Sequence, residues 1–176
     1  RLFVPDTVDA LLQLSGWYRE RFEVPIVAIT GSNGKTTTKD MAASVLSKRY
    51  RTAKTRGNYN NHIGVPMTLF ELTSEHEAAV IEIGMNHVGE IASRAEAARP
   101  WVGVITNVAE AHTETMRDVD TIASAKAELL DALPPEGTAI LNWDDELVKA
   151  LWTRGPSSII TFGLSSDAEV RATDVR

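Results

Sequence analysis

The sequence contains no cysteine, which excludes disulfide bonds, thiolate metal sites and cysteine nucleophiles. It also has no apolar run near the roughly 18 residues that span a bilayer, and residues 1–5 lack the long apolar segment of a secretory signal. We therefore expect a soluble, cytoplasmic protein that does not act at a membrane.

Basic residues are fewer than acidic ones. Lys and Arg number 18 against 24 Asp and Glu, which gives a net charge of -6, and no basic run is longer than Lys48-Arg49. Because a phosphate backbone would be repelled, the composition argues against nucleic acid as a partner. With 176 residues, 43% of them hydrophobic, the chain has the size and composition of one globular domain.

Short apolar runs alternate with helical segments along most of the chain. The pattern predicts strands at 26–30, 52–55, 78–83, 102–106, 139–141 and 158–162, and helices at 6–22, 35–49, 66–72, 89–99, 120–133 and 144–153. Strands that are apolar on both faces and separated by helices indicate an α/β fold with a doubly wound, mostly parallel sheet and helices on both faces. In such sheets ligands bind at the carboxyl ends of the strands.

A glycine-rich turn follows the first predicted strand, in the segment Thr30-Gly31-Ser32-Asn33-Gly34-Lys35-Thr36-Thr37-Thr38. Its glycines let backbone N–H groups face phosphate oxygens, its lysine neutralises the outer phosphates, and the next hydroxyl can bind Mg²⁺, as in P-loop NTPases. The general pattern has a glycine where this chain has Ile29, so the alternative is a turn that only caps a helix. The expected nucleotide ligands are Gly31, Ser32, Asn33, Gly34, Lys35, Thr36 and Thr37.

Two further polar side chains follow predicted strands. Glu82 lies in an otherwise apolar run, where a carboxylate is costly unless it is paired or binds a metal. A Mg²⁺ ligand beside the glycine-rich turn is the favoured interpretation, and a structural ion pair is the alternative. His112 lies in the loop after strand 102–106 and is either a ligand at the sheet edge or a solvated histidine.

Lys126 lies in the apolar stripe of predicted helix 120–133. Ile122 is four residues before it, and Leu129 and Leu130 are three and four residues after it. A desolvated lysine has a lowered pKa, and its neutral amine can act as a nucleophile or form a carbamate with carbon dioxide. The alternative is a lysine whose stem packs while its ammonium reaches water.

The loop from Gly57 to Gly64 is rich in side-chain amides. Amides both donate and accept hydrogen bonds, which suits a polar substrate such as a peptide carboxylate or a sugar nucleotide. Asparagine is also a common turn residue, so the loop alone does not distinguish the two roles. The candidate substrate-binding residues are Asn58, Asn60 and Asn61.

Five motifs occur in order between residues 25 and 130, at 31–39, 57–66, 82–87, 107–112 and 125–128. Together they resemble the ATP-binding middle domain of the Mur ligases, the amide ligases of peptidoglycan synthesis. The resemblance is strongest to the members that use ATP to phosphorylate the terminal carboxylate of a UDP-muramoyl tripeptide. The amine of D-alanyl-D-alanine then attacks the acyl phosphate.

The resemblance also implies roles for individual residues, with ATP and two Mg²⁺ ions as cofactors. Lys35 would hold the outer phosphates, and Thr36 with Glu82 would bind one Mg²⁺. His112 and a carbamate on Lys126 would serve the second Mg²⁺. Asn107 would contact the nucleotide, and Asn58, Asn60 and Asn61 would contact the muramoyl substrate.

Members of the family carry a preceding and a following domain. Because residue 1 is arginine rather than methionine, we expect a piece of a longer enzyme, itself a monomer. Residues 1–24 would be the tail of the preceding domain, and 25–176 the middle domain, truncated at its C-terminal end. Such a fragment would bind nucleotide weakly and would not ligate alone. Two other functions stay open: a related ligase of the folylpolyglutamate or cyanophycin synthetase type, and a non-catalytic P-loop nucleotide-binding module.

Overall fold

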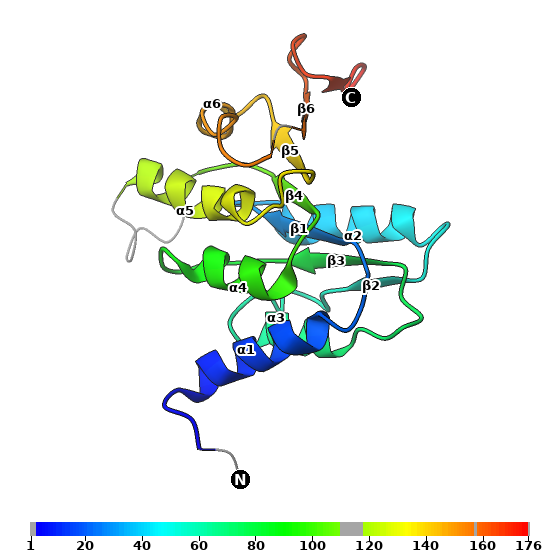
Figure 1. Ribbon diagram of the computed structural model, residues 1–176. Helices are drawn as coiled ribbons and strands as arrows, with labels where there is room; N and C mark the ends of the chain where they lie inside the picture. The colour runs from blue at the N-terminus through cyan, green and yellow to red at the C-terminus, as the bar shows by residue number, and fades with distance from the viewer. Residues whose placement is uncertain (1–2, 110–117, 157, 176) are drawn as a thin grey trace.

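A computed structural model describes residues 3–109, 118–156 and 158–175. In this part of the chain seven strands form one parallel sheet in the order β2-β3-β1-β4-β5-β6-β7 (Figure 1). The strands are β1 (Ile26–Thr30), β2 (Thr52–Lys54), β3 (Ala78–Glu82), β4 (Val102–Ile105), β5 (Thr138–Asn142), β6 (Ser158–Gly163) and β7 (Val170–Arg171). The predicted fold class is confirmed.

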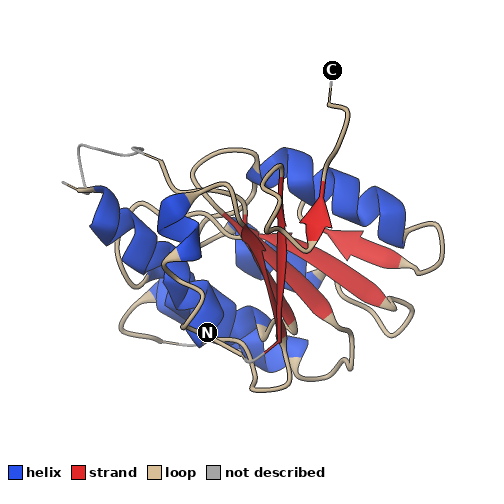
Figure 2. Ribbon diagram, turned by 90° about the horizontal axis from the view of Figure 1, so that it is seen from above, coloured by secondary structure: helices blue, strands red, loops and turns tan. Residues whose placement is uncertain are grey.

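Helices cover both faces of the sheet. The helices are α1 (Thr7–Arg19), α2 (Lys35–Leu46), α3 (Gly64–Phe70), α4 (Glu90–Ala98), α5 (Val119–Asp131) and α6 (Glu146–Lys149). Figure 2 shows one long helix, α2, on one side of the strands and the other long helices on the opposite side. None of the helices in the described ranges has the length and apolarity needed to cross a lipid bilayer.

The central strands are buried because helices pack on both of their faces. All five residues of β3 are buried, which explains the continuous apolar run in the sequence. The larger core lies on the side of α3, α4 and α5, and a smaller cluster under α2 contains Ile29, Ala43, Val80 and Val104. Burial of these strands fixes the position of the loops that follow them.

Helix α1 packs on α3 and α4. Asp6 caps it by accepting hydrogen bonds from the N–H groups of Val8 and Asp9. Arg19, near its other end, donates to the carbonyl oxygens of Ala98 at 3.0 Å and Val24 at 2.7 Å. The segment that we expected to be the tail of a preceding domain is therefore joined to this body by buried hydrogen bonds.

Two predicted helices differ from the structure, and one strand was not predicted. Pro66 was predicted to begin its helix but is the third residue of α3, a position where a missing N–H costs no helical bond. The predicted helix 144–153 is wrong in length: α6 has four residues, after which the chain continues in turns. Strand β7 was not predicted, because its two exposed residues carry no apolar pattern. The other predicted ends agree with the structure or differ by at most three residues.

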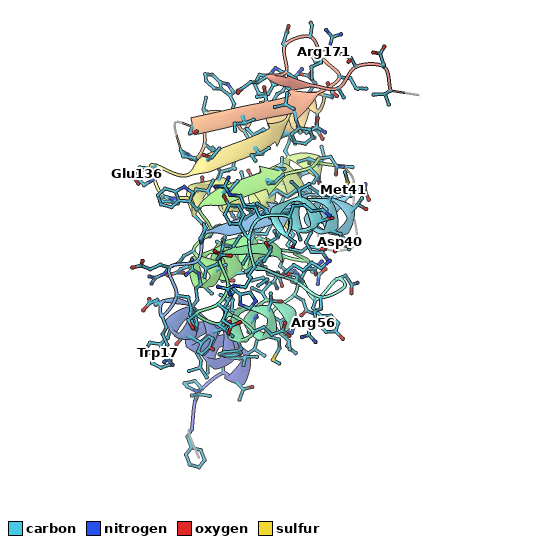
Figure 3. The ribbon with its side chains drawn as sticks, turned by 90° about the vertical axis from the view of Figure 1, so that its right-hand side faces the viewer. Trp17, Asp40, Met41, Arg56, Glu136 and Arg171 are labelled. Atoms are coloured by element: carbon cyan, nitrogen blue, oxygen red, sulfur yellow. The ribbon has the colours of Figure 1, made fainter. Side chains whose placement is uncertain are left out.

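All strands in the described ranges run in one direction, so their carboxyl ends lie along one side of the sheet and their amino ends along the other. In Figure 3 the arrowheads point to the right; Arg56, just after β2, lies on the right, and Glu136, just before β5, lies on the left. The loops on the right-hand edge follow the carboxyl ends of the strands. This is the edge where ligands bind in open α/β sheets.

Candidate functional site

The site lies where β1, β3 and β4 end. Strand β1 lies between the other two, and the loops after β1 and β3 open onto one pocket of about 170 Å³. The pocket is lined by Gly31, Ser32, Lys35, Asn60, Asn61, Gly84, Met85, Asn86, Arg94, Ile122 and Lys126. Because pockets that enclose a drug-sized ligand measure roughly 300–1,000 Å³, this one suits a phosphate or carboxylate group rather than a whole nucleotide.

The glycine-rich turn forms the wall of the pocket at the end of β1. Gly34 has a left-handed φ of 77° and precedes the first residue of α2. The ammonium of Lys35 donates to the carbonyl oxygens of Gly31 at 2.8 Å and Ser32 at 3.0 Å. Burial lowers the pKa of Lys35, and the charge of Glu82 partly offsets this effect. A helix N-terminus and a lysine thus face one small pocket, which favours an anion there.

The chain that follows β4 holds this turn in shape. Asn33 N–H donates to Oδ1 of Asn107 at 2.8 Å, and Nδ2 of Asn107 donates to the Asn33 carbonyl at 3.2 Å. The Thr106 hydroxyl donates to the same carbonyl at 2.6 Å, and the Ser32 hydroxyl bonds both backbone groups of Ala109 at 2.9 Å. Both polar atoms of the Asn107 amide are therefore engaged by Asn33.

Gly31 allows a very close approach between the turn and β4. Its φ is 149°, and an added Cβ would lie 1.9 Å from the Thr106 hydroxyl. We expect Gly31→Ala to lower the free energy of unfolding by about 1–3 kcal/mol through overpacking, measured by urea denaturation. Gly89→Ala is the control, since Gly89 has a φ of 88° with nothing within 4 Å of an added Cβ. Equal effects of the two substitutions would contradict this prediction.

Glu82 ends β3 and is almost fully buried, at 1% exposure. Its Oε1 accepts a hydrogen bond from Nδ2 of Asn60 at 2.7 Å, and its Oε2 lies 4.0 Å from the ammonium of Lys39. The ion pair that we left open as an alternative is therefore present. Even so, Oε2 is buried and has no hydrogen-bond partner among the described residues.

The residues present fit a Mg²⁺ ion that is also bound by phosphate. Mg²⁺ prefers oxygen ligands and commonly takes one or two carboxylates, with water and substrate phosphates completing its shell. The free oxygen of Glu82 provides such a ligand, and Thr36 lies in the first turn of α2. Within the described residues no group of three acidic or histidine side chains could hold a metal without such help.

The loop of residues 57–64, called the asparagine loop below, closes the pocket from the side of β2 and α3. Oδ1 of Asn61 accepts from the N–H groups of Gly64 at 2.9 Å and Ile63 at 3.1 Å, which holds the loop against the start of α3. Gly84 N–H donates to the Asn60 carbonyl at 2.9 Å, which ties the loop to the end of β3. Asn60 and Asn61 line the pocket, whereas Asn58 is exposed and does not.

Lys126 of α5 faces Lys35 across the pocket. It is 4% exposed, so its ammonium does not extend into bulk water as the alternative required. Burial, and then the charge of Lys35, lowers the pKa of Lys126 to about 8. Arg94 of α4 also lines the pocket, where it donates to the Gly84 carbonyl. Among the described residues, the lining therefore contains three basic side chains and no carboxylate.

Glu128 links the helices that carry Lys126 and Arg94. Its carboxylate accepts from the N–H groups of Gly89 at 2.7 Å and Ala92 at 2.9 Å, at the N-terminus of α4. We expect Glu128→Ala to destabilise the chain by about 1–2 kcal/mol, as loss of a helix cap does, in thermal or urea unfolding. Replacing the exposed Glu136 with alanine should change stability by less than about 0.5 kcal/mol. A Glu128 variant as stable as that control would show that the cap contributes nothing.

The comparisons with known proteins agree with this geometry. A family model described as the Mur ligase middle domain matches residues 29–176. The chain belongs to the Mur ligase middle domain family. The UDP-N-acetylmuramoyl-tripeptide--D-alanyl-D-alanine ligase of Synechocystis sp. is 46% identical over 165 residues, which cover 93% of this chain and 36% of the relative.

Solved structures of Mur ligases superpose closely on this middle domain. A crystal structure of MurF from Acinetobacter baumannii has a TM-score of 0.94 and 41% identity, over 99% of this chain and 39% of that one. MurF ligase from Thermotoga maritima, solved in complex with ADP, has a TM-score of 0.86 and 30% identity, over 94% of this chain and 38% of that one. The Mur ligase middle domain described here thus spans a little over a third of the length of these relatives.

The pocket of this Mur ligase middle domain brings together most of the predicted site residues. Gly31, Ser32, Lys35, Asn60, Asn61 and Lys126 line it, Asn33, Gly34, Thr36 and Thr37 belong to the same turn, and Glu82 and Asn107 are bonded to members of this set. Asn58 lies outside the lining, and His112 lies outside the described residues.

Sequence reasoning missed two basic residues of the site, Lys39 and Arg94. Both are buried, and each has a buried apolar residue about one turn away on its helix: Ala43 follows Lys39 by four residues, and Ile91 precedes Arg94 by three. The spacing rule that identified Lys126 is therefore the signal that could have found them.

Proposed function

We propose that this domain is the ATP-binding part of a ligase that joins D-alanyl-D-alanine to a UDP-muramoyl tripeptide. One observation carries the proposal: Lys35, Lys126 and the asparagine loop line a single pocket, and Glu82, bonded to Asn60 through Oε1, keeps a second oxygen, Oε2, without a hydrogen-bond partner among the described residues. The printed names of the relatives with the same motifs support this substrate pair. We further expect residues 25–176 to be the middle domain of a monomeric, cytoplasmic enzyme.

The basic lining suits a reaction between two anions. In the proposed step an oxygen of the tripeptide carboxylate attacks the γ-phosphorus of ATP, ADP leaves, and an acyl phosphate forms. The amine of D-alanyl-D-alanine then attacks the acyl carbon, and phosphate leaves. Lys35 and the N-terminus of α2 would hold the phosphoryl oxygens, and Asn60 and Asn61 would orient the carboxylate substrate.

Thr36 and Glu82 would hold one Mg²⁺, and His112 with the carbamate of Lys126 would serve a second. The positive charge would offset the repulsion between carboxylate and phosphate. Asn107 would act mainly by keeping Asn33 and the turn in shape, since its amide bonds are already used there. Asn58 stays a predicted substrate contact, through its position in the asparagine loop.

Lys126 is a candidate for a carbamate. With a pKa of about 8, about a tenth of its amine is neutral at pH 7. The nitrogen lone pair would bond the carbon of carbon dioxide, one π pair would move to oxygen, and a proton would leave to water. The product carries negative charge and could orient a cation. Incubation with carbon-13 bicarbonate should give a carbamate signal that disappears in Lys126→Ala.

The function is tested by supplying the substrates one at a time to the full-length ligase that contains this domain. ADP release should require both UDP-muramoyl tripeptide and D-alanyl-D-alanine, and oxygen-18 should pass from the tripeptide carboxylate to phosphate. ATP hydrolysis that ignores every carboxylate substrate would favour the non-catalytic module, and release that depends on a folate or another acid would favour a related ligase.

A further inference from the structure

Lys39 has an unusual environment for a lysine. It follows Lys35 by one turn of α2 and is 1% exposed, the largest fully buried side chain in the described ranges. Its ammonium donates to the Gly57 carbonyl at 2.6 Å and lies 3.5 Å from Oδ1 of Asp40 and 4.0 Å from Oε2 of Glu82. Because an enclosed ammonium loses its hydration, such a placement is costly unless every contact is favourable.

The contacts of Lys39 connect three parts of the site. Helix α2 begins at the glycine-rich turn of residues 30–38, called the phosphate turn below. Gly57 begins the asparagine loop with a left-handed φ of 51°, and Glu82 ends β3. Asn60 connects the loop to Glu82, since its Nδ2 donates to the Glu82 carboxylate at 2.7 Å. The asparagine loop is therefore attached to α2 through the Gly57 carbonyl, and to the end of β3 through the Asn60 side-chain amide and the Asn60 carbonyl.

We propose that Lys39 is a positioning residue that fixes the asparagine loop and Glu82 relative to the phosphate turn. Through Gly57 it sets where the loop begins, and through its charge it holds the Glu82 carboxylate, which in turn orients Asn60. The catalytic consequence rests on the proposed function: Lys39 keeps the loop that binds the carboxylate substrate correctly placed relative to the γ-phosphate of ATP. The structural consequence does not depend on that function.

The structural consequence is tested by amide hydrogen exchange on this chain, with Lys39→Met, which keeps the apolar stem. Two backbone amides report on the asparagine loop: Gly84 N–H, which donates to the Asn60 carbonyl, and Val65 N–H, which donates to the Asn61 carbonyl. Trp143 N–H, bonded to Phe162 between β5 and β6, is the remote reference. We expect exchange at the two reporters to rise at least about tenfold more than at the reference, because local opening becomes easier.

Lys54→Met is the matched control. Lys54 bonds Oδ1 of the same Asp40 at 2.7 Å, but it is half-exposed. This variant loses the same charge and should change reporter exchange less than about twofold, as expected for an exposed ion pair. If Lys39→Met accelerates all amides equally, or leaves the reporters unchanged, the positioning role is wrong.

The unpaired carboxylate left by Lys39→Met could prevent folding. In that case Glu82→Gln is compared with the double variant Lys39→Met/Glu82→Gln, in which no buried charge is left alone. Faster reporter exchange in the double variant than in Glu82→Gln supports the link through Gly57. Equal exchange in the two contradicts it.

Kinetics of the full-length ligase give a second readout. We expect Lys39→Met to raise KM for the UDP-muramoyl tripeptide about tenfold, while KM for D-alanyl-D-alanine changes less than about twofold. Equal changes for both substrates would contradict a role in positioning the asparagine loop. An enzyme without ligase activity would refute the proposed function, and the exchange experiment would still decide the role of Lys39.

Discussion

Replacing Lys126 with methionine is expected to stabilise the chain at pH 7 by up to about 3 kcal/mol. The pKa of Lys126 is lowered from 10.5 to about 8 by burial and then by Lys35, and each pKa unit corresponds to about 1.4 kcal/mol. Below pH 8 the ammonium is charged in both the folded and unfolded chains, so the folded chain carries the full cost of desolvation. Methionine has a similar shape without the charge.

The stabilisation by Lys126→Met should depend on pH. Between pH 8 and 10.5 the unfolded chain binds more protons at this site than the folded chain, so the stability of the native protein rises with pH. The advantage of Lys126→Met should therefore shrink over this window and vanish above pH 10.5. Urea unfolding of both proteins at several pH values measures the difference, with exposed Lys48→Met as the control. A variant that is less stable than the native chain at pH 7 would contradict the assignment of a desolvated amine.

The same substitution should abolish ligation if the proposed carbamate operates. We expect the turnover of the full-length ligase to fall about 10²–10³-fold, comparable to the loss of one preorganised electrostatic group. A gain in stability combined with a loss of activity is the signature of a group held at the site for its chemistry. Activity near that of the native enzyme would show that Lys126 is structural.

Replacing Lys35 with methionine has the other large expected effect. If Lys35 holds the phosphates as proposed, loss of its charge should reduce ATP-dependent turnover of the proposed full-length ligase about 10²–10³-fold, measured by ADP release. Lys35→Arg is the control for charge, and it should restore part of the phosphate affinity while failing to reproduce the geometry of the lysine. Turnover unchanged in Lys35→Met would rule out the assignment of the phosphate turn.

A second readout of Lys35→Met does not require activity. Because the charge of Lys35 contributes to lowering the pKa of Lys126, its removal should raise the pKa of Lys126. The rate at which Lys126 is acetylated at pH 7 should then fall, because less neutral amine is present. An unchanged rate would mean that the two amines do not interact across the pocket.

The fold was predictable because its signals are local. Short apolar runs such as 78–81, set between helical patterns, are typical of strands buried on both faces, and Asp6 caps α1 as its position suggests. The phosphate turn was found from its glycine, lysine and threonine spacing after a strand, and Glu82 and Lys126 were found because their residue types conflict with their apolar surroundings. A charged side chain in an apolar pattern indicates a buried charge, and such a charge is costly unless it is paired or binds a ligand.

The parts that sequence reasoning missed depend on distant contacts. The Asn107 amide bonds Asn33, 74 positions away, and no spacing rule predicts such a pairing. Lys39 is harder to find than Lys126 because the helix around it, Lys35–Leu46, is rich in threonine and has little apolar contrast. The two-residue strand β7 follows from pairing with β6 rather than from its own sequence.

We propose that the phosphate turn, the asparagine loop and the end of β3 form one nucleotide phosphate pocket. Titration of the nitrogen-15 labelled chain with MgADP tests this most directly. We expect shifts of the amide signals of residues 31–36 together with those of Asn60 and Gly84, even if the dissociation constant is as weak as about 1 mM. Signals that stay unshifted at these residues, or shifts confined to the groove around Trp143 and Trp152, would contradict it.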